Sequence, residues 1–337
     1  MDSNDSQDEN HGIEPEECTM NEITAGIEVL VSEVGPRDGL QSIKQTMATH
    51  AKLDWIRALA GAGLREIEVG SFVSPKLLPQ MADTGDVVRE AVRIPGLTVL
   101  ALVPNLTGAQ RAIDAGTPKL TMPISASRAH SLQNIGKTPE EAIEEVRKVG
   151  VLRDSLPAGK RPFVEVGIST AFGCTMEGPV SEAWVLRMAV LLAQAGADSV
   201  GLSDTTGYAN PAQVKRMFIQ LKRELGDKAG GAHLHNTRGQ GLANVVAALE
   251  AGVTTFDSSQ GGLGGCPYAP GATGNIVTED LVFMLESMGL STGIDIDKLI
   301  AARTIVIEAL PGEPIYGHVP DAGVTKGFVP ASVRRGA

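Results

Sequence analysis

The fold of this 337-residue chain is constrained most by a regular alternation of short apolar runs with longer amphipathic segments. The runs are β-branched or apolar, which predicts buried strands, and most of them precede a segment with Ala, Leu and Val at helical spacing. Alternation of buried strands with helices is typical of a parallel sheet. The eight expected strands are residues 29–34, 66–69, 97–103, 120–123, 163–168, 199–202, 232–235 and 255–258.

The number of strands and the residues at their ends favour a closed barrel over an open sheet. Eight is the number of parallel strands that closes into a (β/α)8 TIM barrel, and the alternative is an open doubly wound sheet. Polar, chemically capable side chains follow almost every strand, and only in a barrel do all strand ends converge on one face. The clearest helices are expected at residues 50–62, 138–152, 181–195, 211–225 and 239–251.

Composition divides the chain into three parts. Residues 1–24 are polar, acidic and aperiodic, which predicts a flexible tail. Residues 25–294 contain the alternating pattern and predict the barrel, with a closing helix at 277–288. Residues 295–337 predict a C-terminal appendage, beginning with a helix at 297–309 and ending in a tail packed on the barrel.

Charge and cysteine content exclude several classes of protein. The net charge is −11, but residues 1–36 hold ten acidic side chains and no Lys or Arg, so the remainder is nearly neutral. No basic stripe for nucleic acid remains, and no apolar run is long enough to span a membrane. The leader resembles neither a signal nor a transit peptide, which favours the cytoplasm. The three cysteines are too scattered for a disulfide framework.

The strongest chemical signal is the sequence HLHN at residues 233–236. Side chains two apart on a strand point to the same side, so His233 and His235 are expected to project together as metal ligands, although either could instead be a hydrogen-bonded core histidine. Asp38 follows strand one and Asn275 follows strand eight, and these strands are neighbours in a closed barrel. Nitrogen and oxygen donors without thiolate favour Mg²⁺ or Mn²⁺ over structural zinc.

Three further polar residues are candidates for catalysis. Arg37 precedes Asp38 on a Gly-Pro turn, and its guanidinium could stabilise an enolate; the alternative is a salt bridge to Glu68 or Glu33. Glu68 and Asp204 also follow strands, and each is either a partner of the metal site and Arg37 or a structural salt bridge.

A glycine-rich segment at 261–275, GGLGGCPYAPGATGN, contains Cys266. Its six glycines and two prolines predict a mobile lid over the active face. A cysteine in such a loop is expected to be reactive, whereas Cys174 has no such context and is expected to be structural.

With these residues in view, the chain resembles the 3-hydroxy-3-methylglutaryl-CoA lyase family from about Val31 to Ile294. The resemblance is carried by EVGPRDGLQ, SFVSPKLLPQMAD, HNTRGQGLAN, FDSSQGGLGGCPYAPGATGN and TEDLVFML. It implies a barrel that binds Mg²⁺ or Mn²⁺ through the four ligands above, an acyl-CoA substrate, and catalytic roles for Arg37 and Cys266, with Glu68 and Asp204 on functional positions. It also implies cleavage of (S)-3-hydroxy-3-methylglutaryl-CoA to acetyl-CoA and acetoacetate. Such barrels often dimerise, so a homodimer or a higher homo-oligomer is expected.

The chain departs from the usual lyase pattern at Leu234, Asn236 and Arg238, where that pattern has Cys, Asp and Tyr. Arg238 could contact a CoA phosphate or substrate carboxylate, or be an exposed residue at a helix start. His130 is expected near the substrate face. These departures keep open a related 3-hydroxyacyl-CoA lyase, acting on citramalyl-CoA or a longer branched glutaryl-CoA. A condensing enzyme like the isopropylmalate and homocitrate synthases, or a barrel that only binds ligand, are further alternatives.

Overall fold

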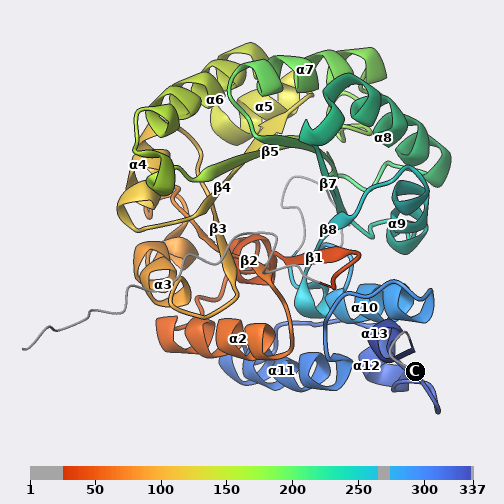
Figure 1. Cartoon of the computed structure of the whole chain (residues 1–337). Coiled ribbons are helices and arrows are strands. Elements are labelled where there is room, and N and C mark those ends of the chain that lie inside the picture. Colours follow the sequence, from red (N-terminus) through yellow and green to blue (C-terminus); the bar gives the residue numbers. More distant parts are fainter. Residues whose placement is uncertain (1–25, 265–273, 335–337) are drawn as a thin grey trace, which may run out of the picture.

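A computed structural model of the chain describes residues 26–264 and 274–334 and has eight parallel strands in a closed barrel (Figure 1). Each strand pairs with the next, and β1 pairs with β8 to close the ring. The predicted (β/α)8 TIM barrel is therefore confirmed. The strands are β1 Leu30–Glu33, β2 Glu66–Ser71, β3 Thr98–Leu102, β4 Lys119–Ser125, β5 Phe163–Ser169, β6 Ser199–Asp204, β7 Ala229–Leu234 and β8 Thr255–Ser258.

A ring of helices surrounds the strands, and the apolar core lies between the two layers (Figure 1). Residues such as Trp55, Ile67 and Val166 are fully buried there. The barrel helices are α2 Thr49–Gly61, α3 Thr84–Ala91, α4 Leu106–Asp114, α5 Arg128–Ile135, α6 Pro139–Asp154, α7 Glu182–Gln194, α8 Pro211–Leu225, α9 Gly241–Glu250 and α10 Thr278–Ser287.

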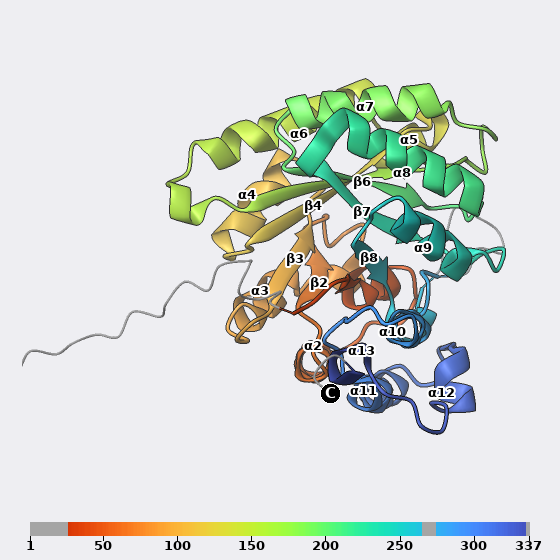
Figure 2. The same cartoon turned by 45° about the vertical axis from the view of Figure 1, so that its right-hand side comes forward.

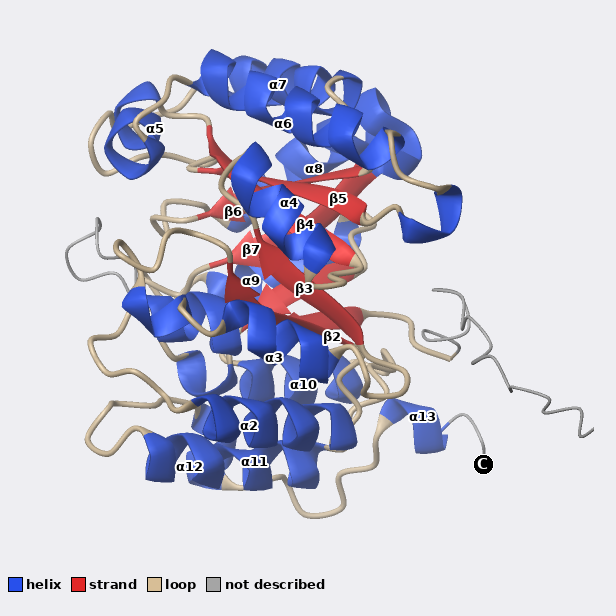
Figure 3. Cartoon of the chain, turned by 90° about the vertical axis from the view of Figure 1, so that its left-hand side faces the viewer, coloured by secondary structure: helices blue, strands red, loops and turns tan. Residues whose placement is uncertain are grey.

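Two short turns shape the end of the barrel at which the strands finish. A single π-helical turn, η1 (Gly35–Gly39), follows β1, and a 3-10 turn, η5 (Gln260–Gly262), follows β8. Figure 3 shows the barrel from the side, with α5 set at the end where β4 finishes. The carboxyl ends of all strands converge on this face, where barrel enzymes hold their active sites.

The amino ends of the strands enclose a different group of buried charges. Lys119 Nζ lies 2.9 Å from Glu66 Oε2 and 2.8 Å from Glu165 Oε2, and it also lies over the ring of Phe163. These residues line a cavity of 370 Å³. We call Glu66, Lys119 and Glu165 the basal cluster. Its three side chains are ion-paired with one another at the amino ends of the strands.

Beyond the barrel lie α11 (Ile296–Ala309), α12 (His318–Ala322) and α13 (Ala331–Arg334). Figure 2 shows them grouped with α2 and α10 on one side of the molecule. In the part of the chain that the structure describes, no helix combines the length and the apolar character needed to cross a membrane.

Candidate metal centre

The two histidines of the HLHN sequence converge as expected. His233 lies on β7 and His235 one residue beyond it, and their Nε2 atoms are 3.1 Å apart. Asp257 on β8 lies beside His233 in the register of the sheet and places a carboxylate oxygen 2.9 Å from its Nδ1. A carboxylate at Nδ1 holds the proton there and leaves Nε2 free to bind a metal. Burial alone would lower the pKa of His233, but Asp257 and Asp38 raise it above its usual value.

Asp38 is brought to the histidines by η1. The Asp38 backbone N–H donates to Val34 at 2.7 Å, and this tight turn directs the side chain back over the barrel. Ligand atoms of Asp38, His233 and His235 all lie within 4.8 Å of one another. Burial would raise the pKa of the Asp38 carboxyl, but Arg37 and the two histidines hold it well below its usual range. Asp38 is therefore an ionised carboxylate facing two imidazole nitrogens.

Asn275 completes the group from the segment before α10. It forms an isolated antiparallel bridge with His235, and its Nδ2 donates to Asp38 Oδ2 at 2.6 Å. Asn275 is 3% exposed, and its Oδ1 has no hydrogen-bond partner within the described residues. A buried polar atom without a partner costs about 1–3 kcal/mol, which a bound cation would remove. The oxygen and imidazole donors thus fit Mg²⁺ or Mn²⁺.

Arg37 lies in the same pocket and forms two ion pairs. Its Nη1 donates to Asp38 Oδ1 at 2.5 Å and its Nε donates to Glu68 Oε2 at 2.5 Å. The alternative salt bridge, predicted to Glu68 or Glu33, is therefore present to Glu68. The Arg37 side chain makes no other hydrogen bond in residues 26–264 and 274–334, so further guanidinium N–H groups are available to a substrate.

The carboxylates expected around the site have different environments. Glu68 also accepts a hydrogen bond from the Thr121 hydroxyl, and burial raises its pKa despite the opposing effect of Arg37. Asp204 accepts hydrogen bonds at Oδ1 from the backbone of Tyr208 and Ala209.

The second oxygen of Asp204, Oδ2, is buried without a partner among the described residues, and burial raises the pKa of this carboxyl to about 6. The salt-bridge alternative for Asp204 is thus wrong within the described residues. Its free oxygen and raised pKa are properties of a group that exchanges protons.

The remaining predicted residues have the following environments. Arg238 is exposed just before α9; its Nη1 donates to the carbonyls of Thr206 and Gly207 and its guanidinium stacks on Tyr208. His130 lies buried on α5, with Nδ1 2.7 Å from the hydroxyl of Ser125, the last residue of β4. Cys174 is fully buried, and Cys266 lies outside the described residues.

Glu33, named from the sequence only as an alternative partner of Arg37, instead hydrogen-bonds to the segments that carry the site. It is fully buried, and its Oε1 accepts backbone hydrogen bonds from Gly35 and Gln260 at 2.8 and 2.9 Å. Its Oε2 lies 2.6 Å from the Thr278 hydroxyl. Burial raises the pKa of Glu33 to about 8. This one carboxyl group joins the beginning of η1 to the two segments that follow β8.

Asp257 was not among the residues predicted for the site, although its place in the sequence gave an indication. The FDSS stretch places Asp257 on an expected strand beside the histidine strand, but only the register of β7 against β8 brings it level with His233.

A closed barrel with a carboxylate, two histidines, an asparagine and an arginine at its carboxyl end defines an enzyme of the metal-dependent aldolase and lyase class. The HMGL-like family model matches residues 28–306, and the chain belongs to this family. The hydroxymethylglutaryl-CoA lyase of Bacillus subtilis is 40% identical over 85% of this chain and 94% of its own length. That of Pseudomonas mevalonii is 43% identical, over 80% of this chain and 89% of its own length.

Solved structures agree with this assignment. The Bacillus subtilis lyase has a TM-score of 0.82 at 39% identity, covering 88% of this chain and 97% of that one. A lyase from Acinetobacter baumannii in complex with coenzyme A and 3-methylmalate has a TM-score of 0.83 at 39% identity, covering 90% and 97%. The family resemblance and the carbon–carbon lyase class predicted from the sequence are therefore confirmed.

Proposed function

We propose that the chain cleaves (S)-3-hydroxy-3-methylglutaryl-CoA to acetyl-CoA and acetoacetate, with Mg²⁺ or Mn²⁺ held by Asp38, His233, His235 and Asn275. The observation that carries the proposal is the convergence of three ionisable ligands within 4.8 Å beside the unpartnered Asn275 Oδ1 and the Arg37 guanidinium. Curated relatives with the same span are hydroxymethylglutaryl-CoA lyases, which supports the choice of substrate.

The chemistry requires a base, an electron sink and an acid. A bound cation would supply a Lewis acid and orient substrate oxygens. Asp204, whose Oδ2 is unpartnered and whose pKa is raised to about 6, takes the proton of the tertiary hydroxyl. The C2–C3 bond then breaks, the C3 oxygen becomes the ketone of acetoacetate, and the electron pair moves into the thioester as an acetyl-CoA enolate.

Arg37 stabilises this enolate, because its guanidinium carries a fixed positive charge in a pocket that is only 11% exposed at that side chain. Glu68 orients the guanidinium through the 2.5 Å contact at Nε. We assign the proton returned to C2 of the enolate to the Cys266 thiol, on the strength of the sequence alone. Passage of the proton from Asp204 to the Cys266 thiolate, by way of solvent, then restores both groups to their starting states.

The departures at Leu234, Asn236 and Arg238 do not alter the ligand set. Leu234 is fully buried, Asn236 accepts a hydrogen bond from Gly241 at the start of α9, and Arg238 is held by carbonyl oxygens. None of the three contacts a proposed metal ligand by side-chain hydrogen bond in the described part of the chain, so the proposed ligand set does not depend on them.

The deciding experiment is acetyl-CoA release from a panel of 3-hydroxyacyl-CoA thioesters with Mn²⁺ or Mg²⁺. We expect turnover of the hydroxymethylglutaryl thioester that EDTA abolishes and added metal restores. Turnover of citramalyl-CoA alone would move the assignment to that lyase. Consumption of acetyl-CoA with a 2-oxo acid would identify a condensing synthase. The same preparation, run by size-exclusion chromatography with light scattering, tests the expected homodimer.

A further inference from the structure

The segment after α11 makes direct contact with the turn that follows β8. The Tyr316 backbone N–H donates to the Gly261 carbonyl at 2.7 Å, and the Glu279 carboxylate accepts the Gly261 N–H at 3.1 Å. Arg303 joins the two, because its Nη1 lies 2.7 Å from Glu279 Oε1 and 2.9 Å from the Tyr316 carbonyl. Both backbone groups of Gly261 are thus held by one buried network.

This contact is a close one between backbones. Gly261 and Gly262 have φ angles of 64° and 58°, in the left-handed region that favours glycine. A Cβ on Gly261 would lie 2.9 Å from the Cβ of Ile315, closer than atoms of this kind approach. The segment 311–316, with Arg303 and Glu279 beneath it, therefore fixes the position of the turn. We call this group, residues 311–316 with Arg303 and Glu279, the brace.

The braced turn lies beside the segment that carries Asn275. Ser259 donates its N–H to the Ile276 carbonyl at 3.0 Å, and the Thr278 N–H donates to Ser259 at 3.2 Å. A Cβ on Gly274 would lie 2.3 Å from the Gly262 carbonyl oxygen, so these two backbones are also in close contact. A shift of the turn would therefore be transmitted to Asn275, three residues from the start of α10.

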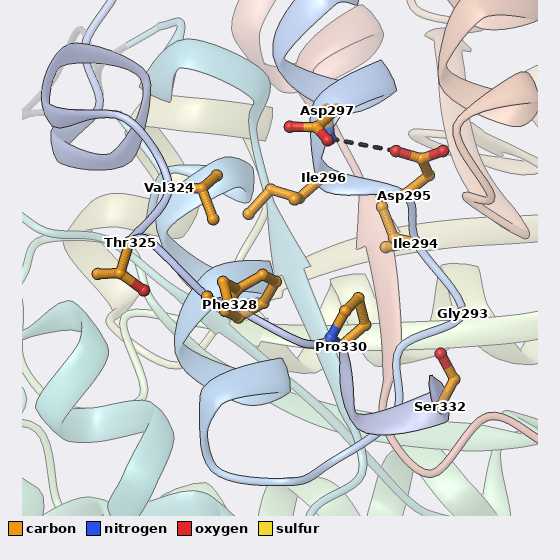
Figure 4. Close-up of a pocket in the computed structure, with 11 residues that line it drawn as sticks. Gly293, Ile294, Asp295, Ile296, Asp297, Val324, Thr325, Phe328, Pro330 and Ser332 are labelled. Carbon is orange, nitrogen blue, oxygen red and sulfur yellow. Dashed lines mark hydrogen bonds between the residues drawn. The ribbon is translucent and has the colours of Figure 1, made fainter. Parts of the chain in front are cut away.

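The rest of the C-terminal tail packs differently. Its distal part lines a pocket of 520 Å³ against the start of α11, between residues such as Asp295 and Phe328 (Figure 4). Its main anchor is Glu286 at the far end of α10, which accepts the Ala331 N–H at 2.6 Å. Among the described residues, no hydrogen bond or ion pair joins this distal part to the proposed metal ligands. A substitution at its anchor can therefore serve as a control for loss of stability without an effect on the metal site.

We propose that the brace is a positioning device for the metal centre, which acts on Asn275 through the Gly261–Gly262 turn. This inference rests on the proposed metal site. The family match ends at residue 306, so segment 311–316 lies beyond the part that defines the family. The chain would then use a segment outside the matched range to set the geometry of an active-site ligand.

The test compares Arg303→Met with Glu286→Gln by titrating each full-length protein with Mn²⁺ without substrate, using electron paramagnetic resonance of free Mn²⁺. We expect the dissociation constant to rise about tenfold in Arg303→Met, with partial recovery in Arg303→Lys. Direct partners of metal ligands contribute about 10- to 100-fold to metal affinity, and Arg303, which acts on Asn275 only through the turn, should fall at the low end of this range. Glu286→Gln should lower the melting temperature and leave the dissociation constant unchanged.

Different outcomes would overturn the brace alone or the metal centre itself. Equal Mn²⁺ affinity in the wild type and Arg303→Met, or equal weakening in Glu286→Gln at the same loss of melting temperature, would overturn the brace. Absence of saturable Mn²⁺ binding by the wild type would overturn the metal centre and the brace with it. Two truncations give a second test: a chain ending at Tyr316 should keep wild-type affinity, and a chain ending at Leu310 should show the weaker affinity of Arg303→Met.

Discussion

The two ends of the barrel hold two buried clusters of charge that differ in how completely they are paired. At the amino end, Lys119 contacts both Glu66 and Glu165, and none of the three has an unpartnered buried side-chain atom in the described residues. At the carboxyl end, Asp204 Oδ2 and Asn275 Oδ1 are buried without partners among residues 26–264 and 274–334. Buried polar atoms that all have partners indicate a structural role. Buried polar atoms that lack partners indicate a site that binds a ligand.

Charge balance shows the same difference. The carboxyl end gathers the acidic groups Asp38, Glu68, Asp204 and Asp257 around the guanidinium of Arg37, and Arg238 acts on Asp204 from beside it. A divalent cation would compensate much of this excess. At the amino end one lysine lies between two carboxyl groups, and burial raises the pKa of Glu165 so that the cluster approaches neutrality without a metal. Variants at the two ends should therefore fail in different ways.

The largest effect is expected from Arg37→Met at the carboxyl end. Loss of the guanidinium should lower kcat on the order of 10³- to 10⁵-fold, the range seen when one arginine stabilises transition-state charge. Mn²⁺ affinity should change little, because Met keeps all four proposed ligands. Steady-state kinetics and a Mn²⁺ titration on the same sample would check this, and near-normal turnover would remove Arg37 from the mechanism.

Lys119→Met tests the amino end. It leaves Glu66 and Glu165 buried without a cation, and breaking a buried ion pair costs about 3–5 kcal/mol. We expect a loss of this size in the free energy of unfolding by urea, with kcat per folded molecule unchanged. The triple variant with Glu66→Gln and Glu165→Gln should recover much of the loss. A fall in kcat with normal stability would show that the basal cluster belongs to the active site.

Asp257→Asn probes the link between strand register and metal binding. The amide can no longer hold the proton at His233 Nδ1 as a carboxylate does, so Mn²⁺ affinity should fall about 10- to 100-fold. Isothermal titration calorimetry measures this directly. Ser258→Ala on the same strand is a control for general disturbance of β8, and equal losses in both variants would contradict a specific role for Asp257.

The smallest effect is expected from Glu33→Gln, which mimics the neutral form of the buried acid. Because the pKa of Glu33 is raised from 4.5 to about 8 by burial, the folded protein binds more protons than the unfolded chain between these values. The stability that this group contributes is therefore lost as pH rises from about 4.5 toward 8, by about 1.4 kcal/mol per pH unit. The variant should show a flatter dependence of unfolding free energy on pH. Parallel curves would mean that Glu33 is already ionised at neutral pH.

Much of the site could be predicted because it depends on strand direction and neighbourhood. Residues two apart on a strand share a side, which placed His233 with His235, and barrel closure makes the first and last strands neighbours, which placed Asp38 near Asn275. These relations follow from alternation and topology alone. The roles of these residues as metal ligands remain predictions.

The features that could not be predicted depend on contacts between distant segments. Arg238 is exposed just before α9, as one of the two alternatives had it, but its hydrogen bonds to the Thr206 and Gly207 carbonyls depend on the loop after β6. Glu33 follows the strand in the same way as a site residue, but its side chain joins Gln260 and Thr278 instead. The brace could not be inferred at all, because nothing local in residues 311–316 indicates that they meet Gly261.

The proposed ligands Asp38 and Asn275 already touch across 237 positions of sequence, at the seam where β1 meets β8. A cation held between them would act as a cross-link that closes one very long loop, and such links stabilise chiefly by restricting the unfolded chain. The metal centre would also form late in folding. The seam must close before the ligands meet, so no fragment that stops short of β8 could assemble the site.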